Sequence, residues 1–271
     1  MPRLISGIKC YIPFAVTEIK ASMAYRMAFF ARLLSNFFTV MITFYLWKAI
    51  YASSTESVIG GFTFEEMTAY VIVSFFTTTM MNSVGINAMA YSIQDGSIAI
   101  SLIRPVSFQG IHFAQSLGAL FVNAVICSLP FMLIFTLDGW LMAPKPLYLA
   151  AYVLSVFLSF VILFYFSFCF AMLAFCTTYF FGINMAKEVI MKLCSGALIP
   201  LSFFTGAIES FFRFLPFSSM NYTPVMIYLG KLEGEALLRA IGLQLFWAVA
   251  LFLLNSIFWK KAIKRLTVLG G

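Results

Sequence analysis

Long stretches without any charged residue constrain this chain more than any other feature of its sequence. Nothing is charged between Arg104 and Asp138, or between Lys145 and Lys187. A helix of roughly 20 apolar residues crosses a hydrocarbon core about 30 Å thick. Charged residues make up 10% of the chain, whereas soluble domains contain about 25%. The stretches show no alternation of polar and apolar residues and are too long for barrel strands, so they predict membrane-spanning helices.

The pattern predicts an all-α integral membrane protein, with one transmembrane domain over residues 1–271. A bundle of six transmembrane helices is expected within 27–259, at about residues 27–50, 67–91, 110–137, 147–176, 189–207 and 237–259. Residues 153–176 contain no Gly, Pro, Asn or Asp with which to turn, so the fourth stretch predicts one long helix. Residues 1–26 are too charged to span and predict an N-terminal interfacial helix on the inner membrane face. Residues 260–271 are expected to form a basic cytoplasmic tail.

The distribution of lysine and arginine predicts the orientation of the chain. With the N-terminus inside, most basic residues fall on the cytoplasmic side, and the outer loops keep only Lys48, Lys145, Arg213, Lys231 and Arg239. Both termini are therefore expected in the cytoplasm. The net charge of +7 reflects this asymmetry, and we expect no nucleic-acid partner because no separate basic domain remains to bind one.

The segment between the fifth and sixth predicted helices combines apolar residues with helix breakers. Glu209 and Arg213 lie four residues apart and can pair on a short helix, which Pro216 ends. Phenylalanines surround Arg213, and Pro224 follows. A short, apolar, proline-broken helix predicts an outer re-entrant segment that dips into the outer leaflet and returns. The alternative is an ordinary amphipathic surface loop.

No arrangement typical of an active site or a cofactor site is present in the sequence. The chain lacks the HExxH, G-x-S-x-G and phosphate-loop motifs, and its five cysteines show no metal-ligand spacing. We therefore expect no catalytic residue, no metal and no cofactor in this chain. ATP hydrolysis, if the protein depends on it, is expected from a separate subunit.

Several polar residues fall within the predicted membrane helices, where they are costly unless they face protein or water. Two interpretations are open for them. They form hydrogen bonds between helices, worth about 1 kcal/mol each, or some of them line a cargo path or a dimer interface. The residues are Asn82, Ser83, Asn87, Gln115, Ser116, Asn123, Gln244 and Asn255. The candidates for the path or interface are Asn82, Asn87, Gln115 and Asn123.

The loop between the second and third predicted helices has the pattern of a short capped helix. Its sequence from Gln94 to Val106 reads QDGSIAISLIRPV. Asp95 or Ser97 can cap the helix at its start, and Pro105 ends it. The length fits two helical turns lying across the cytoplasmic face.

This loop and three other segments together resemble the permease subunit of bacterial type-2 ATP-binding-cassette exporters. Tyr25-Arg26 precedes the first predicted span, and GFTFEE at residues 61–66 enters the second. The loop is similar to the family's signature of a glycine, a small apolar helix and Leu-x-Arg-Pro-Val. The late segments IPLSFF and LPFSSMNYTPVMIYLG resemble the family's outer re-entrant segment. The likeness covers about residues 20–260.

The resemblance implies a coupling helix between the second and third spans that lies in a groove of a separate ABC ATPase subunit. On this reading the contacts to the ATPase come from Gln94, Asp95, Gly96, Ser97, Ile100, Arg104 and Pro105. It also implies a second permease, identical or related, beside this one, with membrane lipid around both. The location implied is the cytoplasmic (inner) membrane of a bacterium.

The function that the resemblance implies is ATP-driven export. The charge-poor composition, with 33 Phe, favours a hydrophobic or amphipathic cargo such as a drug, a lipid-linked molecule or a peptide. Two other classes remain open. One is a membrane scaffold or assembly protein that transports nothing, and the other is an ion-coupled secondary carrier, for which internal inverted repeats are expected.

Overall fold

The computed structural model describes residues 7–24, 26–81, 86–175, 177 and 180–263 of the chain. The elements of the first half are η1 (Ile8–Cys10), α1 (Ile12–Ala24), α2 (Arg26–Ser53), β1 (Val58–Ile59), β2 (Phe62–Thr63), α3 (Phe64–Met81), α4 (Ile86–Gln94), α5 (Ile98–Ile103), α6 (Phe108–Val122), the π-helical η2 (Asn123–Ser128) and α7 (Leu129–Leu137). Those of the second half are α8 (Pro146–Ala171), η3 (Met172–Phe175), α9 (Phe181–Cys194), η4 (Leu201–Phe203), α10 (Ala207–Phe214), α11 (Pro216–Met220), α12 (Tyr222–Tyr228) and α13 (Gly234–Ala262).

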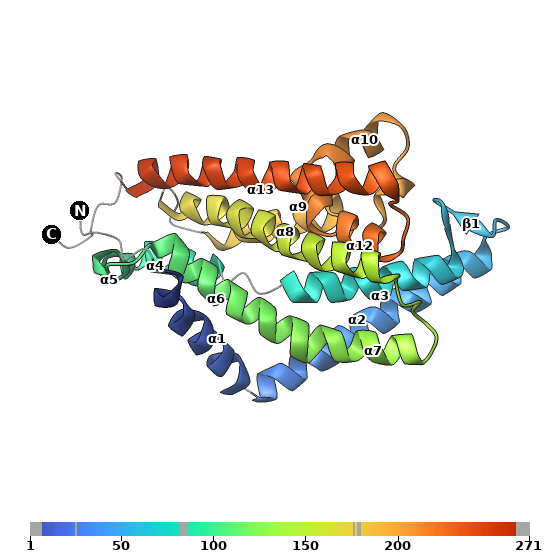
Figure 1. Ribbon diagram of the computed structural model, residues 1–271, viewed down its shortest axis with the longest axis horizontal. Helices are drawn as coiled ribbons and strands as arrows, with labels where there is room; N and C mark the ends of the chain where they lie inside the picture. The colour runs from blue at the N-terminus through green and yellow to red at the C-terminus, as the bar shows by residue number, and fades with distance from the viewer. Residues whose placement is uncertain (1–6, 25, 82–85, 176, 178–179, 264–271) are drawn as a thin grey trace.

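The long helices run roughly along the long axis of the molecule (Figure 1). Helix α5 lies at one end, here called the α5 end, and the β1–β2 hairpin lies at the other, the hairpin end. Helix α8 is central, because α13, α12 and α11 all pack against it, while α3 packs against α2 and α12.

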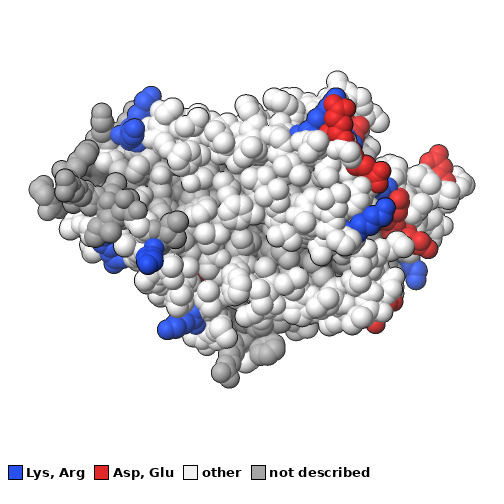
Figure 2. Space-filling model, in the orientation of Figure 1, with Lys and Arg blue, Asp and Glu red and all other residues white. Residues whose placement is uncertain are grey.

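Charged side chains gather at the two ends and leave a broad uncharged belt between them (Figure 2). On the visible face, the charges at the α5 end belong to Lys and Arg, whereas the hairpin end carries both signs. Such a belt is the surface that a hydrocarbon core requires, because charged groups are costly in lipid.

The expected fold class, an all-α membrane protein, is confirmed. Within the described residues, three helical segments are long and apolar enough to cross a membrane: residues 108–137 and 146–175, of 30 residues each, and 234–262, of 29. The segment 146–175 is a single helix without a hairpin turn, as the absence of turn residues predicted. The total of six spans remains a prediction.

The helix over residues 108–137 contains a π-helical turn, which Pro130 explains. Proline has no N–H, and its ring clashes with the carbonyl four residues earlier, here that of Ile126. The π-helical turn at Asn123–Ser128 lies directly before Pro130 and accommodates the ring without ending the helix.

The fifth predicted helix was placed wrongly. It was expected over 189–207, but α9 covers Phe181–Cys194 and then stops. Gly196 ends the helix with a φ of +77°, a conformation that glycine adopts with little strain because it lacks a side chain. Pro200 lies in the segment that follows. Lys187 and Glu188, expected in a cytoplasmic loop, are therefore helical residues of the bundle. The second predicted helix corresponds to α3 and α4, on either side of residues 82–85.

The β1–β2 hairpin was not expected from the sequence. Its strands pair antiparallel, with Val58 opposite Thr63 and Ile59 opposite Phe62. Gly60 and Gly61 form the turn with φ values of +57° and +82°, as a two-residue hairpin turn of this kind requires. The Gly-Gly pair between two dipeptides of β-branched and aromatic residues was the available signal.

Helix α1 packs along α6 near the α5 end (Figure 1). A glycine permits the close approach, since a Cβ on Gly118 would lie 2.4 Å from the carbonyl oxygen of Ala15. Nearby, the backbone N–H of Ser107 donates to the Tyr11 hydroxyl over 3.1 Å. The N-terminal helix is thus fixed to the bundle.

Candidate functional site

The loop over residues 94–105, here called the α5 loop, has the local geometry that its sequence predicts. Gly96 turns the chain at a φ of +77°, and the N–H of Ser97 donates to Asp95 Oδ1 over 2.8 Å. Helix α5 ends at Arg104, which is extended, as expected of a residue before proline. Asp95 therefore supports the start of α5, while the Ser97 side chain makes no capping bond.

One side of the α5 loop is anchored to the bundle. Ile98 is fully buried in a cluster with Met89 of α4 and Phe168 of α8. The Gln94 side-chain amide donates to the Thr177 carbonyl over 3.4 Å, a long hydrogen bond. A displacement of α5 would therefore act directly on α4 and, through it, on α8.

The other side of the α5 loop is free of protein contact and largely apolar. Ile100 is 65% exposed and Ile103 80% exposed. Arg104 and Asp95 are exposed beside them, and Arg104 forms no hydrogen bond or ion pair with any residue in the described part of the chain. Hydrogen bonds from Ser97 lower the pKa of the Asp95 carboxyl, so it stays ionised at neutral pH.

The carbonyl groups at the end of α9 accept hydrogen bonds from one side chain and one backbone N–H. The Tyr70 hydroxyl donates to the Gly196 carbonyl over 2.5 Å, and the N–H of Tyr222 donates to the Ser195 carbonyl over 3.0 Å. Asn221 bridges Ser74 and Thr78 of α3, with distances of 2.8 and 3.1 Å. A helix that ends among apolar neighbours needs such partners, because no water is there to replace them.

The segment over residues 207–228 returns into the bundle after one exposed helix. The predicted pair forms, with Arg213 Nη2 2.6 Å from Glu209 Oε1, and Arg213 also donates to the Tyr222 hydroxyl over 3.1 Å. Pro216 opens α11 directly after α10, and Pro224 lies in the buried α12. Because α11 and α12 are buried against α8, the alternative of an ordinary surface loop is wrong.

Of the four polar residues predicted for a cargo path or a dimer interface, the structure describes the side chains of two, so this assignment stays a prediction. Asn82 lies outside the described residues, and the side chain of Asn87 is likewise not described. Gln115 is half-buried and Asn123 buried, on α6 and η2. Neither lines the α9 cavity described below.

Gln244 joins three helices in the core through hydrogen bonds. The sequence indicated that polar residues in the membrane helices form such bonds, but it did not indicate their partners. The Gln244 side chain accepts from Ser155 over 2.9 Å and donates to Ser159 over 3.0 Å and to the Ser219 carbonyl over 2.9 Å. Asn255 similarly accepts from Gln109 over 2.6 Å. The interpretation of membrane-embedded polar residues as interhelical bonds is confirmed for Gln244 and Asn255.

A polar cavity of about 270 Å³, here called the α9 cavity, lies between α3, α8, α9 and the α11–α12 junction. Lys187, Glu188 and Lys192 of α9 line it, together with Thr78 and Asn221. This site was not predicted from the sequence, because Lys187 and Glu188 were expected outside the bundle. The charged i, i+1, i+5 pattern on an otherwise apolar helix was the signal.

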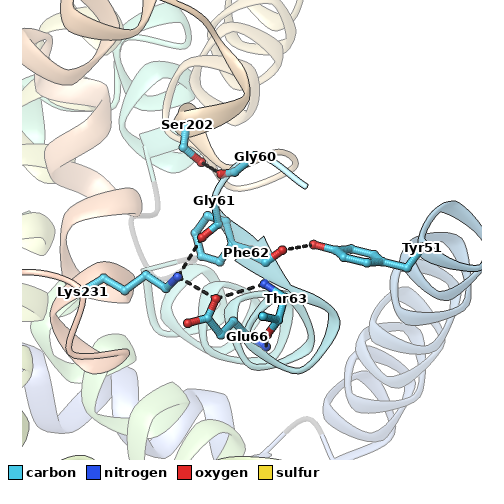
Figure 3. A network of polar contacts seen from close by, with 8 residues as sticks. All are labelled: Tyr51, Gly60, Gly61, Phe62, Thr63, Glu66, Ser202 and Lys231. Carbon is cyan, nitrogen blue, oxygen red and sulfur yellow. Dashed lines mark hydrogen bonds and ion pairs between the residues drawn. The ribbon is translucent and has the colours of Figure 1, made fainter. Parts of the chain in front are cut away.

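A network of hydrogen bonds ties the hairpin to four other segments (Figure 3). Lys231 reaches Glu66 Oε2 over 2.8 Å and the Gly61 carbonyl over 3.0 Å. Tyr51 donates to the Phe62 carbonyl and Ser202 to the Gly60 carbonyl, each over 2.7 Å.

Glu66 links this network to the start of α3. It accepts from the N–H of Thr63, while its own N–H donates to the Thr63 hydroxyl, which is a capping box. Burial alone would raise the pKa of Glu66. Its pKa nevertheless lies below the ordinary value, because the hydrogen bonds from Lys231 and Thr63 and the charge of Lys231 together outweigh the effect of burial.

Comparison with known proteins places the chain in a family. Residues 23–270 match the family described as "ABC-2 family transporter protein". The match covers nearly the whole chain, including the α5 loop, the α9 cavity and the segment over 207–228. A comparison with curated proteins found no match.

Proposed function

Since the chain belongs to the ABC-2 transporter family and is thus a membrane component of an ABC-type transporter, we propose that it is the permease of an exporter driven by a separate ATPase subunit. We further propose that it works beside a second permease and moves an amphipathic cargo out of the cytoplasm.

The observation that carries this proposal is the architecture of the α5 loop. One side is packed into the bundle at Ile98, and the other presents Ile100, Ile103 and Arg104 to solvent. An apolar patch with a flanking arginine is typical of the centre of a protein interface. Because α5 packs against α4, which packs against α8, a partner that moves α5 would also move the bundle.

The charges at the two ends support an orientation with the α5 loop in the cytoplasm. The visible face of the α5 end carries only basic groups, and the hairpin end carries both signs (Figure 2). Lysine and arginine near helix ends are retained on the cytoplasmic side. The α5 loop would then face the compartment that holds ATP.

Two substitutions, one at Arg104 and one that breaks helix α5, test whether the α5 loop couples ATP hydrolysis to transport. In membranes that contain the chain and its ATPase subunit, Arg104→Ala and Ser101→Pro are expected to abolish cargo-stimulated ATP hydrolysis. The first removes the exposed charge of the proposed interface, and the second breaks α5, at a cost of about 3 kcal/mol to the helix. Membrane insertion should be unchanged, because neither residue lies in a core cluster.

Arg239→Ala provides the matched control, since Arg239 is an exposed arginine at the hairpin end with one exposed ion partner. It should hydrolyse ATP like the wild type. If Arg104→Ala and Ser101→Pro retained full stimulation and still copurified with the ATPase, the α5 loop would not be the coupling element. If no ATPase copurified with the wild-type chain, the exporter proposal itself would fail.

A further inference from the structure

Lys187 is the most unusual charged residue in the described part of the chain. Its side chain is only 6% exposed, and it lines the α9 cavity. It forms no hydrogen bond or ion pair with any other described residue. The ammonium keeps some solvent access through the cavity, since Ser219 Oγ alone is fully buried without a partner among the described side chains. A charged group in so largely buried a place is costly and favours a partner of opposite charge.

The neighbouring carboxylate of Glu188 attracts Lys187 at a distance but forms no ion pair with it. Glu188 accepts a hydrogen bond from Asn184 over 3.2 Å and is exposed, and it is not within ion-pair distance of Lys187. Lys192 adds a second positive charge to the cavity wall. The three ion pairs of the described residues, Glu209–Arg213, Lys231–Glu66 and Glu235–Arg239, involve none of these side chains.

The remaining lining defines what the cavity can hold. Leu163, Met81 and Met220 form an apolar wall, and Thr78 provides a hydroxyl. The volume of about 270 Å³ is enough for an acidic head group and the first part of an apolar chain. Cations are disfavoured because the two lysines outnumber the single carboxylate.

We propose that the α9 cavity binds the anionic head group of an amphiphilic cargo, with the Lys187 ammonium as its main partner and Lys192 as a second. The assignment of this ligand as cargo rests on the proposed transport function. Binding itself does not, because it needs neither ATP nor the ATPase subunit.

The test measures binding to the full chain in nanodiscs of phosphatidylcholine, with two probes that differ only in charge. Each probe is a dodecyl chain with a fluorescent nitrobenzoxadiazole group at one end, and a sulfonate or a neutral sulfonamide at the other. Fluorescence anisotropy is expected to show binding of the sulfonate about tenfold tighter than that of the sulfonamide, because one charge-assisted hydrogen bond supplies this difference.

Variants of the two lysines identify the partner. Lys187→Gln should lose this preference for the sulfonate, Lys187→Arg should keep most of it, and Lys192→Gln should weaken it by less than Lys187→Gln. The matched control is Lys48→Gln on α2, an exposed lysine outside the cavity, which should bind like the wild type. Equal binding of both probes, or an unchanged preference in Lys187→Gln, would overturn the proposal.

A stability measurement separates lost binding from lost folding. Without ligand, Lys187→Met should raise the melting temperature in detergent, because an apolar side chain of similar length replaces an unpaired charge. A lowered melting temperature would mean that Lys187 has a structural partner in the free protein, which contradicts the proposal.

Competition distinguishes the sources of the anion. Inorganic phosphate and phosphatidylglycerol are each added to the nanodiscs with the sulfonate probe bound. Weak displacement by both supports an amphiphilic cargo. Displacement by phosphate at the concentration of the probe would indicate a site for a soluble anion, and efficient displacement by phosphatidylglycerol would indicate a lipid site; either would overturn the cargo assignment. If the site binds as proposed but no ATPase copurifies, the transport proposal alone fails.

Discussion

At the scale of single residues, two kinds of position govern this molecule: glycines where backbones meet, and polar side chains within the apolar bundle. Gly118 lets α1 approach α6. Gln244 replaces the water that its amide would have outside the membrane with contacts to Ser155, Ser159 and Ser219. Each such group is satisfied in only one arrangement of the helices, so it specifies the packing as well as stabilising it.

Gly118→Ala should lower the stability of the chain. Its new Cβ would lie 2.4 Å from the Ala15 carbonyl oxygen, so α1 must shift, at a cost of about 1–3 kcal/mol. Thermal unfolding in detergent measures the effect. Gly242→Ala on α13 is the control, because no heavy atom lies within 4 Å of its Cβ and alanine favours a helix by about 1 kcal/mol. Equal shifts in both variants would show that α1 does not pack as described.

Turns, helix ends and contacts between residues close in the sequence were predictable, because they depend on neighbouring residues along the chain. The turn at Gly96, the stop before Pro105 and the pair of Glu209 with Arg213 all follow from neighbours along the chain. The contact between Lys231 and Glu66 was not predictable, because it joins residues 165 positions apart. Lys187 was misplaced since a charge was assumed to lie outside the membrane, whereas a protein cavity can hold it.

At the scale of secondary-structure elements, the end of α9 is the feature that shapes the core. The chain leaves the helix at Gly196 and returns through η4 and α10 to α11 and α12, which are buried against α8. Gly196 and Pro200 are helix breakers that could have indicated this end, but the absence of charge around them favoured a continuous span. Apolar composition locates membrane segments and does not by itself show where a helix stops.

Tyr70→Phe should destabilise the end of α9. It removes the hydroxyl that donates to the buried Gly196 carbonyl, and an unsatisfied buried acceptor costs about 1–3 kcal/mol. The control is Tyr45→Phe on α2, because Tyr45 is 57% exposed and its hydroxyl makes no hydrogen bond with the described residues. We expect a lower melting temperature for Tyr70→Phe alone; a melting temperature equal to that of the control would show that the bond contributes nothing.

At the scale of the whole molecule, the α5 loop and the α9 cavity are connected through α8. Ile98 of the loop and Phe168 of α8 belong to one buried cluster, with α4 packed against both helices, and the cavity is lined by Leu163 of α8. The hydrogen-bond network around the hairpin lies at the opposite end of the molecule (Figures 1 and 3). A partner that moves the α5 loop could therefore change the cavity without any long pathway, provided that the loop faces the cytoplasm.

Cysteine accessibility in intact cells tests that orientation most directly. In a chain whose five native cysteines are replaced, Ser97→Cys places a thiol in the exposed α5 loop, and Ser57→Cys places a matched thiol at the exposed hairpin end. A membrane-impermeant maleimide should label Ser57→Cys in intact cells and Ser97→Cys only after permeabilisation. Labelling of Ser97→Cys from outside intact cells, with Ser57→Cys protected, would contradict the proposed coupling to a cytoplasmic ATPase.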